Sequence, residues 1–135
     1  ELRDYLARKG HGSVVQEEVV AWLEELGYVD DLQFSQQWIE SRCRFKPMGE
    51  RRLVYELQQK GIPQVIIDEA ILGFREAIDE TELACQLARA KVKTYHGQEM
   101  SAVKRKLAGF LKRRGFRAKD IYYALDQVLE KEVET

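Results

Sequence analysis

A nine-residue pattern that recurs three times is the feature that most constrains the fold. In each copy a leucine is followed four residues later by a second leucine, and the copy ends with a basic residue and a glycine. The copies occupy residues 2–10, 53–61 and 107–115, so their starts are 51 and 54 residues apart. Self-similarity at one period indicates a repeat architecture.

A second pattern lies between the copies. Asp31-Leu32-Gln33-Phe34-Ser35 and Glu80-Thr81-Glu82-Leu83-Ala84 each place acids before a large apolar residue and a small one, 49 residues apart. The repeating unit of about 50 residues therefore includes this segment.

Each part of the unit has the apolar spacing of an α-helix. The first stripe after residue 12 comprises Val15, Val19, Trp22, Leu23 and Leu26. Gly27 is expected to end that helix, and Asp30 or Asp31 to cap the next one. Further stripes fall within residues 53–57, 66–74, 83–95, 103–111 and 121–129, and no long alternation indicates a strand. We expect about eight helices, with these stripes packed between them.

The predicted fold is all-α: tandem three-helix repeats forming an elongated, curved array. Residues 1–28 form a partial first repeat of two helices, residues 29–76 the second repeat and residues 77–135 the third. The array is expected to be continuous, without flexible linkers. Three units meet the usual minimum for a stable array.

No catalytic or cofactor motif is visible. There is no nucleophile–base arrangement, paired carboxylate or phosphate-binding glycine loop. The two cysteines and two histidines are isolated, so neither a disulfide framework nor a metal site is predicted. Because no catalytic motif is visible, we do not expect an enzyme. Because no apolar run could span a membrane and no signal peptide opens the sequence, we expect a cytoplasmic protein.

Charge is strongly segregated although the net charge is only −1. Residues 1–40 hold nine acids and three bases, whereas residues 86–120 hold eleven bases and two acids. Lys9, Lys60 and Arg114 precede the repeated glycines, where a cation meets the negative end of a helix dipole. We interpret these three bases as structural residues that stabilise the ends of their helices.

Other bases point away from the predicted core. Arg51 lies about 160° from Leu53, and Arg105 occupies the equivalent position in the next repeat. Bases interleaved with aromatics suit nucleic-acid phosphate or an acidic protein surface, while an ordinary solvated helix face is the alternative. Three of the candidates, at positions 42, 44 and 46, are expected in a loop ended by Pro47 and Gly49. The candidate binding residues are Arg42, Arg44, Lys46, Arg51, Arg52, Tyr55, Lys104, Arg105, Lys106, Lys112 and Arg113.

Three blocks of the sequence, taken together, carry a family resemblance. They are Gly27-Tyr28-Val29-Asp30-Asp31-Leu32-Gln33-Phe34, then Gly49 with Arg52-Leu53 and Glu56-Leu57-Gln58-Gln59-Lys60-Gly61-Ile62, and Phe110-Leu111-Lys112-Arg113-Arg114-Gly115-Phe116. In these blocks, which span most of the chain in the family's order, the sequence resembles the RecX family of bacterial recombination regulators.

The resemblance implies a cytoplasmic regulator of recombination and the SOS response. We expect the chain itself to be a monomer. RecX-like proteins bind RecA–DNA filaments in their helical groove and inhibit the ATPase, co-protease and strand-exchange activities of RecA. The family normally has nine helices and has no catalytic motif to transfer. The eight expected here leave the first repeat incomplete.

Two specific hypotheses follow, beside a generic helical adaptor. In the first, the repeats bind RecA, and the bases contact acidic RecA or, weakly, DNA phosphate. In the second, the chain binds single-stranded nucleic acid without RecA, and Phe45, Tyr55 or Tyr123 stacks on bases.

Overall fold

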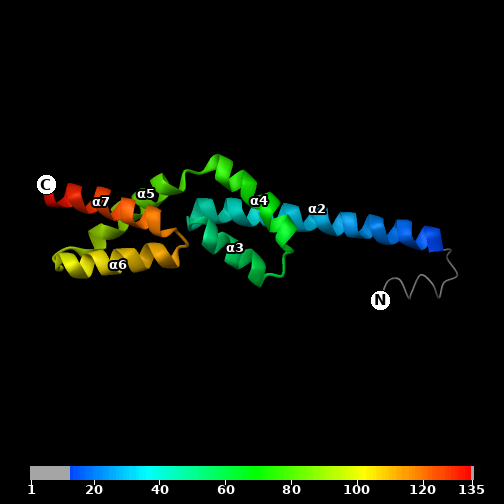
Figure 1. Ribbon diagram of the computed structural model, residues 1–135, viewed down its shortest axis with the longest axis horizontal. Coiled ribbons are helices and arrows are strands. Elements are labelled where there is room, and N and C mark those ends of the chain that lie inside the picture. Colours follow the sequence, from blue (N-terminus) through cyan, green and yellow to red (C-terminus); the bar gives the residue numbers. More distant parts are fainter. Residues whose placement is uncertain (1–12, 135) are drawn as a thin grey trace.

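The structure, a computed structural model, describes residues 13–134, with side chains from 17 to 130. It is built of α-helices and one short 3₁₀ turn, and no strand occurs within that range, so the predicted all-α class is confirmed. α2 reaches one end of the long axis, α3 and α4 lie beside its C-terminal part, and α5, α6 and α7 lie together at the other end (Figure 1). Their bounds are α2 Ser13–Phe45, α3 Glu50–Gln59, α4 Gln64–Ala77, α5 Glu80–Val92, η1 Lys93–Tyr95, α6 Met100–Arg113 and α7 Ala118–Glu134.

The repeated leucines form the centres of two separate cores. Leu53 and Leu57 of α3 are fully buried among residues of α2 and α4. Leu107 and Leu111 of α6 are equally buried between α5 and α7. Each leucine that loses all contact with water contributes roughly 1.5–3 kcal/mol. We call the first body, formed by α3, α4 and the C-terminal part of α2, repeat 2, and the second body, α5–α7, repeat 3.

The repeated glycines end helices, as predicted. Gly61 and Gly115 have φ of 80° and 87°, in the left-handed region that a glycine adopts without strain. The following amides, of Ile62 and Phe116, donate back to the carbonyls of Leu57 and Leu111 at 3.1 and 3.2 Å. These bonds satisfy carbonyls that the helix end leaves without partners. The first copy of the pattern, residues 2–10 with Lys9, lies outside the described residues.

The prediction of a helix break at Gly27 is wrong. α2 is one helix of 33 residues where two were expected, so residues 13–134 contain six α-helices instead of the seven expected there. The eighth expected helix falls within residues 1–12, outside the described residues. The equivalent break, between α4 and α5, occurs at Ile78, which is extended and packs against the core of repeat 2. Val29 holds the same repeat position but is 53% exposed. Because Val29 does not pack against a core, nothing favours an extended conformation there, and the backbone hydrogen bonds of the helix continue.

Two further expectations about α2 are wrong. Its first apolar stripe was expected in the core, yet Trp22 is 58% and Leu26 43% exposed. Arg42, Arg44 and Phe45 were expected in a loop but form the last turn of the helix, which continues to residue 45. The first predicted unit boundary, after residue 28, falls inside α2; the division into units stays a prediction.

Candidate interaction site: a basic cleft between two repeats

Repeats 2 and 3 meet through backbone at two glycines. The Gly49 amide donates to the Arg114 carbonyl at 2.7 Å, and the Arg114 side chain donates to the Pro47 carbonyl at 2.7 Å. A Cβ atom on Gly49 would lie 2.5 Å from the Gly115 oxygen, and one on Gly115 would lie 2.4 Å from the Arg52 nitrogen. This approach leaves no room for a side chain and fixes how the two repeats sit against each other.

A charged network flanks the glycine contact. The Glu50 carboxylate accepts two hydrogen bonds from Arg75, at 2.6 and 2.9 Å, and lies 3.5 Å from Arg117 of repeat 3. The Glu50 amide donates to the Glu80 carboxylate at 2.5 Å. The Glu50 side chain is only 11% exposed, whereas Arg75 and Arg117 are 54% and 44% exposed, so solvent screens these contacts in part. The two repeats are therefore held together by charge as well as by backbone.

The Glu50 network should make stability depend on acid pH. Hydrogen bonding to Arg75 lowers the pKa of Glu50, so its contribution is present above the ordinary glutamate pKa and is lost as pH falls through the lowered value. Burial raises the pKa of Glu80, whose contribution has the opposite sign. We expect Glu50→Gln to lower the free energy of unfolding by about 2 kcal/mol at pH 7.

Urea unfolding of both proteins between neutral pH and about pH 2 checks this. The difference should shrink toward zero at the acid end, where the wild-type carboxyl is also neutral. Glu76→Gln, at an exposed position of α4, is the matched control and should change little at any pH. A difference for Glu50→Gln that persists undiminished in acid would mean that its charge is not what binds the repeats.

A basic cleft opens at the junction. It consists of two adjoining cavities of about 430 and 360 Å³, and Arg52 and Arg113 line both. We call their combined lining the junction cleft: Lys46, Met48, Arg51, Arg52, Tyr55, Phe110, Lys112, Arg113, Arg114 and Gly115. Six of these ten residues are cationic and none is acidic, so the cleft has a positive potential suited to an anionic ligand.

The cations of the cleft are not equally available. Arg114 lies 5.0 Å from the centre of the Phe110 ring and is bonded to Pro47, and burial lowers its pKa. Arg52 lies 3.5 Å from Glu56 and over the Tyr55 ring. In contrast Lys46, Arg51, Lys112 and Arg113 are exposed and have no ion pair within the described residues. These four are best placed to meet a partner.

The structure brings together about half of the residues singled out from the sequence. Those in the junction cleft are Lys46, Arg51, Arg52, Tyr55, Lys112 and Arg113. Lys104 and Arg105 instead line a separate groove between α6 and α7. Lys106 donates to Gln98 at 2.6 Å, beside a loop of repeat 3. Equivalent repeat positions thus face different surroundings, because among the described residues a further repeat packs beside the bases of α3 but not beside Lys104, Arg105 and Lys106.

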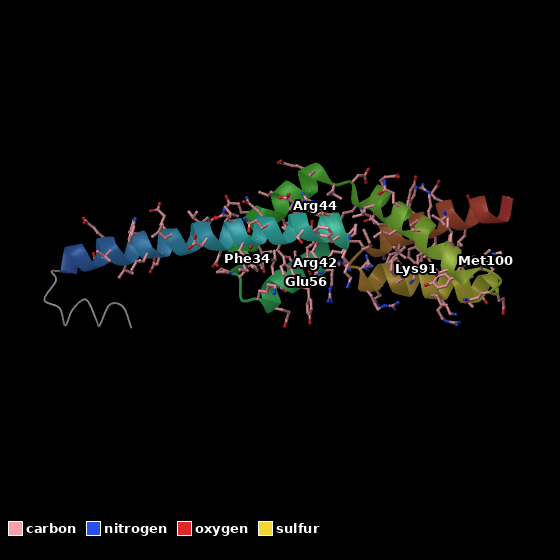
Figure 2. All side chains as sticks on the ribbon, turned by 180° about the vertical axis from the view of Figure 1, so that it is seen from behind. Phe34, Arg42, Arg44, Glu56, Lys91 and Met100 are labelled. Carbon is pink, nitrogen blue, oxygen red and sulfur yellow. The ribbon has the colours of Figure 1, made fainter. Side chains whose placement is uncertain are left out.

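Arg42 and Arg44 have structural partners. Arg42 donates two hydrogen bonds to Glu56, at 3.0 and 3.1 Å, and its guanidinium lies 4.7 Å from the centre of the Trp38 ring. Figure 2 shows Arg42 beside Glu56, where α2 lies against α3. Arg44 forms an exposed pair with Glu40 one turn earlier. Arg42 therefore connects α2 to α3, and neither residue lines the junction cleft.

Sequence reasoning missed three members of the cleft. The sequence places Phe110 in a core stripe and Arg114 at a helix end, and it indicates no role for Met48. All three become lining residues because repeat 3 presents the end of α6 to the loop before α3. Within the described residues no group of His, Cys, Asp or Glu could hold a metal ion, and no helix is long and apolar enough to cross a membrane.

Fold and cleft together define a class, the all-α tandem-repeat proteins with a charged groove between units. The family model described as RecX, second three-helix domain, matches residues 30–71, and the model of the RecX third three-helix domain matches residues 78–125. The chain therefore belongs to the RecX family.

Relatives named "Regulatory protein RecX" match nearly the whole chain. The protein of Prosthecochloris aestuarii is 35% identical over 96% of this chain and 82% of its own. That of Chlorobaculum tepidum is 38% identical over 98% of this chain and 79% of its own. A crystal structure of RecX from Lactobacillus salivarius has a TM-score of 0.67 at 18% identity, covering 95% of this chain and 82% of that one. This last likeness is one of fold. The relatives are named as regulators, and nothing found points to catalysis.

Proposed function

We propose that the chain regulates homologous recombination and the SOS response in the cytoplasm by binding RecA–DNA filaments in their helical groove. Bound there, it inhibits the ATPase, co-protease and strand-exchange activities of RecA without chemistry of its own. The junction cleft is the contact surface, and Lys46, Arg51, Lys112 and Arg113 meet acidic RecA side chains or the DNA backbone.

The observation that supports this proposal most is the convergence of cations from two repeats on one cleft. Arg51 of α3 and Lys112 of α6 are 61 positions apart in sequence yet line the same cavity. An elongated array with its cations at a junction in mid-molecule can contact more than one subunit of a filament. Membership of a family of regulatory proteins makes RecA the partner to test first.

A second candidate function is single-strand binding without RecA. Tyr55 is 49% exposed and lies in the cleft beside Arg51 and Arg52, where its ring could stack on a base. Both candidate functions use the same surface. They are therefore distinguished by whether the chain binds RecA filaments more tightly than bare DNA, and by whether inhibition of RecA requires that DNA be limiting.

Titration against two targets separates them. The labelled chain is added to RecA filaments on single-stranded DNA and to the bare DNA, at salt from about 50 to 200 mM, while RecA ATP hydrolysis is followed with DNA in excess. The first candidate, regulation of RecA, predicts that the chain binds filaments more tightly than bare DNA. It also predicts that RecA ATP hydrolysis is inhibited although DNA is in excess. Bare-DNA affinity should fall about 100-fold over that range, the slope of about five phosphate contacts. Equal affinity for both targets, with inhibition only when DNA is limiting, would establish the second candidate instead.

A further inference from the structure

Outside the junction cleft, a groove between α6 and α7 forms a cavity of about 830 Å³. Ala108, Leu125 and Leu129 give it an apolar floor. Its α6 side carries Lys104 and Arg105, and its α7 side carries Asp126 and Glu130. Among the described residues no ion pair joins the two sides.

The equivalent positions of repeat 2 are paired instead of open. When Leu107 is aligned with Leu53, Lys104 takes the place of Glu50; the same offset of 54 residues puts Leu129 in the place of Arg75. In repeat 2 these two positions form the ion pair that closes the gap, and Arg117 of repeat 3 adds to it. The α6–α7 groove is thus the open form of a surface that, in repeat 2, is covered by the next unit.

An exposed apolar stripe lies at the other end of the molecule. Trp22, Leu26 and Val29 are 58%, 43% and 53% exposed, and at 100° per residue they fall within about 60° of one another on α2. Glu18 and Glu25 border the stripe on one side. The first base in α2 is Arg42, so this half of the helix is purely acidic.

Stripe and groove match in length and charge. From Trp22 to Val29 the helix rises about 10 Å, and the α6 wall from Met100 to Ala108 about 12 Å. The acidic edge of the stripe can face the basic wall of the groove, which leaves the less charged edge toward α7. A helix whose apolar face enters a groove between two helices is a common mode of recognition.

We propose that copies of this chain associate head to tail, with the Trp22–Leu26–Val29 face of α2 from one copy in the α6–α7 groove of the next. Stripe and groove lie at opposite ends, and Met100 marks the far end from α2 (Figures 1 and 2). One copy therefore cannot fill its own groove, and the contact does not close into a dimer. The inference goes beyond the proposed function and needs neither RecA nor DNA.

The contact is small, so the association is expected to be weak and to appear only at high concentrations of the chain. Sedimentation equilibrium from about 10 µM to 1 mM, the range for a small interface, should show a weight-average mass rising through dimer to higher species. A strictly monomeric chain throughout would overturn the proposal, as would a mass that stops at the dimer.

Two surface variants test which faces meet. Trp22→Gln/Leu26→Gln removes the apolar stripe, and Lys104→Glu/Arg105→Glu reverses the basic wall. Each should weaken association about 30-fold or more, the loss expected for a central tryptophan or a matched charge pair. Val65→Gln, at an apolar position of α4 that is 64% exposed and outside both surfaces, is the control and should leave association unchanged. Circular dichroism verifies that each variant is folded.

Mixing the two variants is the decisive measurement. The stripe variant keeps an intact groove and the groove variant keeps an intact stripe. One copy of each can therefore form one interface, and no third copy can join the pair. The mixture should give a one-to-one dimer although each variant alone is monomeric. The absence of a dimer in the mixture would contradict head-to-tail contact. A symmetric interface uses the same residues on both copies, so mixing two variants that have each lost it would not restore it.

Discussion

Gly115→Ala is expected to lower the free energy of unfolding by about 3–5 kcal/mol, a large part of the stability of a domain of this size. Two costs combine. The backbone at residue 115 has φ of 87°, a conformation that costs an alanine about 1–2 kcal/mol. The new Cβ would also lie 2.4 Å from the Arg52 amide nitrogen, so the two repeats must move apart. Chemical unfolding monitored by circular dichroism measures the loss.

Gly61→Ala is the matched control for this prediction. Gly61 ends α3 with φ of 80°, nearly the same conformation, but a Cβ there would meet nothing within 4 Å. It should lose only the conformational part, about 1–2 kcal/mol. The difference between the two variants therefore reports the contact between repeats. Equal losses in both would show that the close approach at Gly115 contributes nothing to stability.

The cores and helix ends could be predicted because they depend on local sequence. Leucines at a spacing of four within a recurring pattern indicate a buried helix face, and the described copies, in α3 and α6, have both leucines fully buried. A glycine after a basic residue indicates a left-handed helix end, which Gly61 and Gly115 adopt. These features follow from the period of the helix and the conformational freedom of glycine.

The continuity of α2 could not be predicted in the same way. Gly27 and Asp30 are reasonable stop and cap signals, and Asp79 does cap α5 by accepting a hydrogen bond from the Glu82 amide. The outcome at each place depends on whether the preceding apolar residue packs onto a core, as Ile78 does and Val29 does not. Tertiary contacts decide between two locally acceptable conformations, so the helix count came out too high.

The cleft was only half visible in the sequence. Helix geometry identified Arg51 and Lys112 as pointing away from the core, but nothing local shows that the end of α6 lies against the start of α3. That placement depends on the Gly49–Gly115 contact, which joins residues 66 positions apart. For the same reason Arg105, although equivalent to Arg51, could not be assigned to a different surface.

Reversing two cations of the junction cleft should weaken binding to RecA filaments about 30- to 100-fold. Arg51→Glu/Arg113→Glu replaces two exposed guanidiniums of the cleft, one from α3 and one from α6, by carboxylates. Loss of attraction to an anionic partner is then added to new repulsion, and each matched charge contact contributes a factor of about ten or more. Neither residue has an ion pair within the described residues, so folding should be little affected.

The control is a second variant with the same change in charge outside the cleft. Lys93→Glu/Lys106→Glu alters two exposed lysines at the loop end of repeat 3, and Lys106 occupies the repeat position of Arg52. Long-range repulsion from the altered net charge acts on both variants alike and is screened by salt. Any difference between them therefore reports the position of the charges.

The most direct test of the central claim is the dissociation constant of each variant for RecA filaments assembled on single-stranded DNA, measured at physiological salt beside the wild-type chain. The account predicts that Arg51→Glu/Arg113→Glu binds about 30- to 100-fold more weakly, while Lys93→Glu/Lys106→Glu stays within about threefold of the wild type. Equal binding by the cleft variant and the wild type, with both variants folded, would contradict the claim that this chain holds the filament through the cleft between its repeats.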